Sequence, residues 1–186
     1  MLRPGAIGRT LFTLVLAAVV PWAMPPTAQA QVNHASDMAT HGVGTTDRQF
    51  LQQAADEGAA EISLALLALK QAKSQQVRQL AQQLLDDHIQ TNRELVTLTN
   101  LKQDAQPAKA PSADNDVQQR LQTLHGDEFD RAYVDQMVQS HQRAVEIFAK
   151  TARNSTDADV KHFAQTKLPV LQHHLALARE LADQGQ

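Results

Sequence analysis

Cysteine is absent from this 186-residue sequence. That absence excludes disulfides, thiolate metal sites and cysteine nucleophiles, because each of them needs a thiol. Aromatic residues make up only 4% of the chain, and glycine and proline occur seven times each. The length fits one globular domain.

Blocks of lysine and arginine are also missing. The chain has 17 Lys and Arg against 20 Asp and Glu, for a formal net charge of -3. Proteins that bind nucleic acid usually carry a clustered basic face, which holds the phosphate backbone. We therefore expect no nucleic-acid partner.

The first 30 residues have the pattern of a secretory signal peptide. Two arginines precede an apolar run over Leu11–Val20, and Ala28-Gln29-Ala30 matches the small residues of a cleavage site. Pro21 ends the apolar run well short of the roughly 20 residues that a spanning helix needs. We predict cleavage between Ala30 and Gln31, export to the periplasm or beyond, and no integral membrane span afterwards. An uncleaved or lipid-associated N-terminus is the alternative.

Residues 31–45 then form a polar tail without a helical period, which we expect to be flexible. His34, Met38 and His41 in this tail are residue types that suit copper. Nothing nearby in the sequence orients them, so a plain linker is the preferred interpretation.

From Thr46 onward, apolar residues recur every three or four positions, which is the period of helices buried along one face. Thr46 and Gln49 match a capping box at the start of a first helix, and Ser74 can cap a second. Pro169 lies inside the fourth helix and should kink it. The pattern predicts four long helices, which begin near residues 46, 74, 127 and 156.

The connections between these helices indicate the topology. The first two helices are joined so closely that they must be antiparallel neighbours. Residues 102–116 have no period and precede a short amphipathic piece over residues 117–124, so the middle connection is long. We therefore predict an all-α fold in which residues 46–186 form a four-helix bundle. A long connection between the second and third helices is the ferritin-like variant.

Four polar side chains fall on the apolar faces of these helices. At about 100° per residue, Glu61, His88, His141 and His174 all point inward. Counted at about 1.5 Å per residue from each helix turn, the first three lie about 18 to 22 Å from their turns, and His174 lies about 30 Å away. Bundle proteins build metal sites from such inward groups on facing helices.

Two functions fit these residues. The first is a metal-binding bundle of the cell envelope, for which zinc or copper suits the imidazoles. Di-iron is disfavoured, because no inward Glu-x-x-His motif is present. The second is a non-catalytic envelope protein in stress tolerance or interaction, whose buried Glu61 and His88 form only a satisfied polar pair. No nucleophile elbow of the Gly-x-Ser-x-Gly type occurs, so we favour a protein without enzymatic activity.

Asp130 also lies on a buried face, and it is a fifth candidate metal ligand. It stands three residues after Asp127, the expected N-cap, where a carboxylate would stabilise the helix terminus. It is also about 16 Å along the helix from His141, so these two residues cannot share one ion. The capping role is therefore preferred.

Several motifs of the chain resemble those of an uncharacterised bacterial family. They are Phe50-Leu51-x-x-Ala54-Ala55 with Glu61-Ile62, Ala81 through Asp87-His88, Phe129-Asp130-x-x-Tyr133 with Met137 and His141, and Leu168-Pro169-x-Leu171-x-x-His174-Leu175. Over about Phe50 to Asp183 the chain is similar to number four-one-four-two in the domain-of-unknown-function series, whose members are often labelled membrane or outer-membrane proteins. The resemblance implies an exported, ferritin-like bundle without an established activity. The matching positions Glu61, His88, Asp130, His141 and His174 are those it implies for a site.

Overall fold

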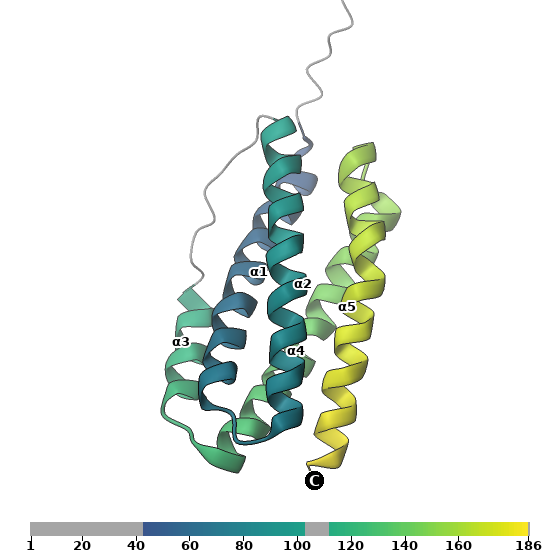
Figure 1. Ribbon diagram of the computed structural model, residues 1–186. Coiled ribbons are helices and arrows are strands. Elements are labelled where there is room, and N and C mark those ends of the chain that lie inside the picture. The colour runs from purple at the N-terminus through teal and green to yellow at the C-terminus, as the bar shows by residue number, and fades with distance from the viewer. Residues whose placement is uncertain (1–42, 103–111, 186) are drawn as a thin grey trace, which may run out of the picture. The chain divides into compact units, whose positions relative to one another are not determined.

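The computed structural model describes residues 43–102 and 112–185. These residues form helices and no strand, in agreement with the predicted all-α class. The predicted signal peptide, its cleavage site and the His34, Met38 and His41 tail lie outside the described residues. The helices are α1 (Thr45–Gln71), α2 (Gln75–Leu101), α3 (Ser112–Gln122), α4 (Gly126–Asn154) and α5 (Ala158–Gln184) (Figure 1).

The short helix α3 is the main departure from the four helices predicted. It occupies the middle connection and begins at Ser112, before the amphipathic piece that the sequence indicated. Leu121 is fully buried, and the side-chain amide of Gln71 on α1 donates to the carbonyl oxygens of Leu121 and Gln122 at 3.4 and 3.3 Å. A helix this short is marginal alone, so its packing on α1 stabilises it.

The four long helices form two hairpins, α1 with α2 and α4 with α5 (Figure 1). Residues 72–74 make the first turn and residues 155–157 make the second. Contact between partners within a hairpin is far more extensive than contact of either hairpin with the other. The two hairpins therefore meet at a seam where their backbones approach closely at fewer positions.

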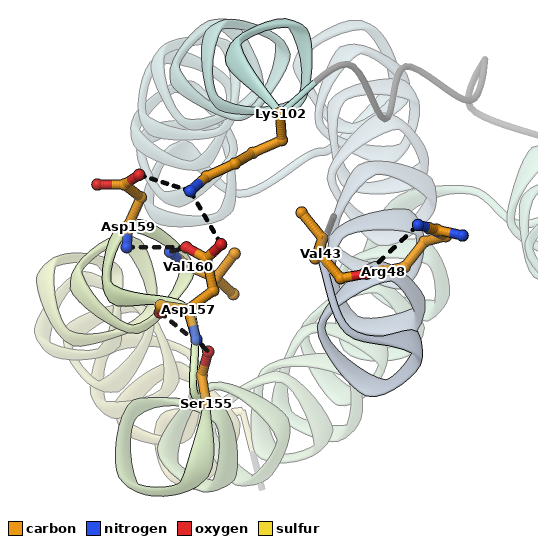
Figure 2. Close-up of polar contacts among 7 residues, drawn as sticks. All are labelled: Val43, Arg48, Lys102, Ser155, Asp157, Asp159 and Val160. Atoms are coloured by element: carbon orange, nitrogen blue, oxygen red, sulfur yellow. Dashed lines mark hydrogen bonds and ion pairs between the residues drawn. The ribbon is translucent and has the colours of Figure 1, made fainter. Parts of the chain in front are cut away.

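Ion pairs at the two ends of the bundle establish the direction of the helices. The Lys73 ammonium, in the first turn, lies 2.8 Å from Asp127 at the start of α4. At the opposite end, Lys102 follows the last residue of α2 and pairs with Asp157 and Asp159 at the start of α5, at 2.9 and 2.6 Å (Figure 2). Helices α2 and α4 therefore run in the same direction, and the middle connection returns along the bundle.

The helix starts confirm some of the predicted caps and correct others. The Ser74 hydroxyl accepts from the Val77 amide at 3.4 Å, as predicted. The Thr46 capping box was wrong, because α1 begins one residue earlier, with Gly44 at its N-cap and no side-chain cap. Helix α5 begins at Ala158 rather than near Thr156, and the Asp157 carboxylate caps it by accepting from two amides (Figure 2).

The core consists of two apolar clusters separated along every long helix. One cluster includes Leu84, Phe129 and Met137 and surrounds the first turn. The other includes Phe50 and Phe148, whose rings meet edge to face with centroids 4.9 Å apart. In each of the four long helices, one inward polar residue lies in sequence between members of the two clusters. None of the helices in the described ranges is both long and apolar enough to cross a membrane.

Candidate metal centre

Three imidazoles from three different helices meet in the middle of the bundle. His88 on α2, His141 on α4 and His174 on α5 are 7%, 1% and 1% exposed. Their ring centroids are 5.3 to 5.7 Å apart, and one ring nitrogen from each lies within 4.8 Å of the others. We call these three residues the imidazole cluster.

His141 is held by its own helix. Its Nδ1 lies 3.0 Å from the carbonyl oxygen of Met137, one turn earlier. A carbonyl only accepts, so Nδ1 carries a proton, and in the neutral ring the lone pair is then on Nε2. That Nε2 is buried and has no hydrogen-bond partner among residues 43–102 and 112–185. His141 is therefore oriented with a bare nitrogen available in the interior.

His174 is held from the neighbouring hairpin. Its Nε2 donates to the Asp87 carboxylate on α2 at 2.8 Å, which leaves the lone pair on Nδ1. Within the described ranges this Nδ1 is buried without a partner. Metal-binding histidines almost always donate their second nitrogen to a carboxylate or a carbonyl in this way. Asp87 and the Met137 carbonyl thus fix two of the three rings.

The third ring, His88, is kept neutral by its surroundings. Burial, with a smaller effect of His141 and His174, lowers the pKa of His88 to about 3. Burial also lowers the pKa of His174, although the hydrogen bond to Asp87 opposes this effect. The Nε2 of His88 is buried and unpartnered by any described residue. At neutral pH His88 and His174 therefore offer lone pairs rather than positive charge.

Glu61 on α1 lies beside the imidazole cluster rather than within it. Its Oε1 is 4.0 Å from Nδ1 of His141, beyond hydrogen-bond distance. Its Oε2 is buried and has no partner in the part of the chain that the structure describes. Burial and, to a smaller extent, the nearby Glu61 charge raise the pKa of Tyr133 well above its usual value. Glu61 thus brings a negative charge to the edge of the cluster.

A hollow of about 50 Å³ adjoins the cluster, and all four long helices line it. Asn92 stands one turn after His88, and its Oδ1 is buried without a hydrogen-bond partner from the described residues. The amide lies directly over Gly58, where an added Cβ would be 2.3 Å from Oδ1. Glycine at this position therefore gives the amide its space.

Asp130 is not brought to the imidazole cluster. Its Oδ1 and Oδ2 accept from the backbone amides of Lys73 and Ser74, at 3.0 and 2.6 Å, in the turn between α1 and α2. The sequence correctly predicted that the Asp130 carboxylate stabilises the start of a helix, but it assigned this role to the wrong helix. Asp130 holds the start of α2 instead of capping α4, where His125 occupies the N-cap position.

The predicted distance of His174 from the second helix turn was too long. Counting every residue from the second turn placed it about 30 Å along the bundle. The structure shows that residues 155–157 are not helical, so α5 begins at Ala158. Counting from there gives about 24 Å, against about 20 Å for His141, which is less than one helical turn of difference.

Two residues of the site were not selected from the sequence. Asp87 lies off the apolar stripe, with 37% of its side chain exposed, yet it reaches His174 across the seam. Asn92 lies on the same face of α2 as His88, but a single inward asparagine in a sequence does not indicate a functional site. The available clue for Asp87 was its position directly before the inward His88. Spacing along one helix could not show that Asp87 pairs with His174 on another helix.

Chemically, the cluster fits a single metal ion. Three neutral imidazoles suit zinc and copper, and the tautomers of His141 and His174 direct a lone pair away from the groups that fix them. Buried nitrogens normally find hydrogen-bond partners, so the bare ones here are exceptional. An ion bound to these nitrogens would satisfy them together.

Several solved structures have a similar fold. A DUF305 fragment from Deinococcus radiodurans aligns with a TM-score of 0.67 and 18% identity, over 76% of this chain and 98% of that one. A DUF305 protein from Streptomyces coelicolor, named as a candidate secreted protein, has a TM-score of 0.64 and 15% identity, over 75% and 93% of the two chains. CopM in its Cu(II)-bound form has a TM-score of 0.64 and 18% identity, over 75% and 97%.

These identities are low enough that the structural likeness speaks for the fold alone. No curated protein sequence matches the chain significantly. A family model described as a domain of unknown function, DUF4142, matches residues 29–181. That range includes α1, α2, α4, all of α5 except its last three residues, and all three members of the imidazole cluster. The chain therefore belongs to the DUF4142 family.

Proposed function

We propose that this protein binds one divalent copper or zinc ion through His88, His141 and His174. The observation that carries the proposal is the set of three ring nitrogens, buried without partners among the described residues. The rings come from three helices, and one nitrogen of each lies within 4.8 Å of the others. In a merely structural cluster, buried nitrogens of this kind normally have a hydrogen-bond partner.

The charges around the cluster support a divalent ion. The carboxyl groups of Asp87 and Glu61 lie beside His174 and His141, at 2.8 and 4.0 Å. Together they can supply two negative charges, which would offset an ion of charge +2 in a buried site. Among divalent ions of the first transition row, imidazole sites bind copper most tightly. The likeness to CopM, which was solved with Cu(II) bound, agrees with this preference.

The fold and the predicted location outside the cytoplasm are the remaining parts of the proposal. The four long helices and the connection that returns from α2 to α4 match a ferritin-like bundle, with α3 added in that connection. The signal-like N-terminus and the likeness to a candidate secreted protein support export to the cell envelope. The function is then the binding or handling of metal outside the cytoplasm.

The test is metal analysis of the full chain, expressed with its signal segment and purified without a His tag. We expect about one copper or zinc ion per chain. With free metal at about 100 times the Kd, we expect a gain of about 2.7 kcal/mol in the free energy of unfolding. His88→Ala, His141→Ala and His174→Ala should each abolish this gain in thermal melts.

His173→Ala is the matched control, because His173 is exposed and directly precedes His174. It should keep both the ion and the gain in stability. A metal-free chain whose melt ignores both ions, with the three cluster variants only less stable, would make the imidazole cluster a packing feature and overturn the proposal.

A further inference from the structure

The hollow beside the imidazole cluster carries an inference that rests on the proposed function. We infer that the bound ion keeps one coordination position open for a small outside molecule that donates hydrogen bonds. Water is the first such molecule, and Glu61 and Asn92 would accept its hydrogen bonds. The protein would then hold its metal in an exchangeable site rather than a closed one.

The number of protein ligands is the first argument. Structural zinc sites are closed by four protein ligands, whereas catalytic sites have three and leave one position for water. Among the histidines and carboxylates of residues 43–102 and 112–185, the group whose ligand atoms come together consists of the three imidazoles. Glu61 is near His141 but does not belong to that group.

The size of the hollow limits what can occupy the open position. A water molecule needs about 10 to 15 Å³ of such space, and the hollow offers about 50 Å³. The ion and a very few water-sized molecules fill it.

The unpartnered atoms lining the hollow define the chemistry of the occupant. Glu61 Oε2 and Asn92 Oδ1 are both acceptors, and neither has a hydrogen-bond partner from the described chain. Glu61 lies on α1 and Asn92 on α2, and the hollow reaches both. Two acceptors call for a molecule with two donor hydrogens, which water supplies and a bare anion does not.

Gly58 leaves the space on α1 that the Asn92 side chain occupies. Helix interiors disfavour glycine by about 1 kcal/mol relative to alanine, so this glycine costs stability unless it serves a contact. The contact is the amide of Asn92, whose Oδ1 would be 2.3 Å from a Cβ at residue 58. The close approach places the amide in the wall of the hollow, beside the metal-binding face of α2.

The experiment uses the full chain loaded with Cu(II). Paramagnetic resonance should show couplings to three imidazole nitrogens, together with strongly coupled protons that vanish in deuterated water. The relaxation of bulk water protons should report exchange of the bound molecule. Nitrogen couplings without such protons, and without enhanced relaxation, would overturn the open position and leave the metal site intact. Absence of Cu(II) binding would overturn both.

Asn92→Leu tests the acceptor with little change in side-chain volume. The loss of a hydrogen bond worth about 1.4 kcal/mol should speed water exchange about tenfold while the nitrogen couplings stay unchanged. Asn92→Asp keeps an acceptor and should restore slow exchange. Asn100→Leu, on the exposed face of the same helix, is the control for a general effect of leucine. Exchange in Asn92→Leu equal to that of the original chain would remove Asn92 from the site.

Discussion

Two buried polar regions of this bundle differ in one respect, the fate of their hydrogen-bonding atoms. At the first turn, both carboxylate oxygens of Asp130 accept from backbone amides, so the group is satisfied by the fold itself. In the middle of the bundle, the described residues leave ring nitrogens of His88, His141 and His174 bare. The first region stabilises the fold, whereas the second has the unsatisfied ring nitrogens on which the proposed metal site depends.

The largest effect that tests this contrast is expected at Asp130. Asp130→Ala removes the acceptor of the Lys73 and Ser74 amides, and the loss of hydrogen bonds to a charged group costs about 3 kcal/mol of unfolding free energy. Urea unfolding measures the change, and metal affinity should stay the same. Asp127→Ala is the control, because its pair with Lys73 is exposed. A loss of metal affinity in Asp130→Ala would break the contrast.

The second prediction concerns Asp87, a positioning residue. Asp87→Ala frees the His174 ring to rotate or to change its tautomer, so metal affinity should fall about 10- to 100-fold, the usual cost of losing such a partner. Competition with a chelator measures it, with Asp86→Ala as the exposed neighbouring control. Affinity that survives Asp87→Ala while His174→Ala abolishes it would show that the ring needs no help from α2.

The smallest effect concerns acid. Burial lowers the pKa of His88 from 6.5 to about 3, so between these values the unfolded chain binds the additional proton. The metal-free protein should therefore lose stability as the pH falls through this window. At pH 5 the His88 share is about 2 kcal/mol, from about 1.5 pH units at about 1.36 kcal/mol each.

Unfolding of the metal-free chain at pH 7 and pH 5 measures that loss. The titratable groups around His88 are His141 on α4 and His174 on α5, with Glu61 on α1 lining the same hollow. His88→Leu should flatten the pH dependence, whereas His162→Ala, at an exposed position, should leave it unchanged. An equally steep dependence in His88→Leu would assign the acid sensitivity to the other groups.

The sequence predicted most of the fold because apolar periodicity records which face of a helix is buried. The same argument placed Glu61, His88, His141 and His174 inward, and all four are buried. Periodicity says nothing about short helices that depend on a neighbour, so α3 was seen only as an amphipathic piece. It also contains no information on contacts between helices, which is why the partner of Asp130 and the reach of Asp87 needed the structure.

The seam between the two hairpins has a consequence for how the protein becomes loaded. The α1–α2 hairpin supplies only His88 to the imidazole cluster, and the α4–α5 hairpin supplies His141 and His174. Neither half of the chain can assemble the three donors alone, however helical it becomes. An ion in the cluster would act as a reversible cross-link between the halves, retained only after they dock, and chelation would loosen the seam before it unwinds any helix.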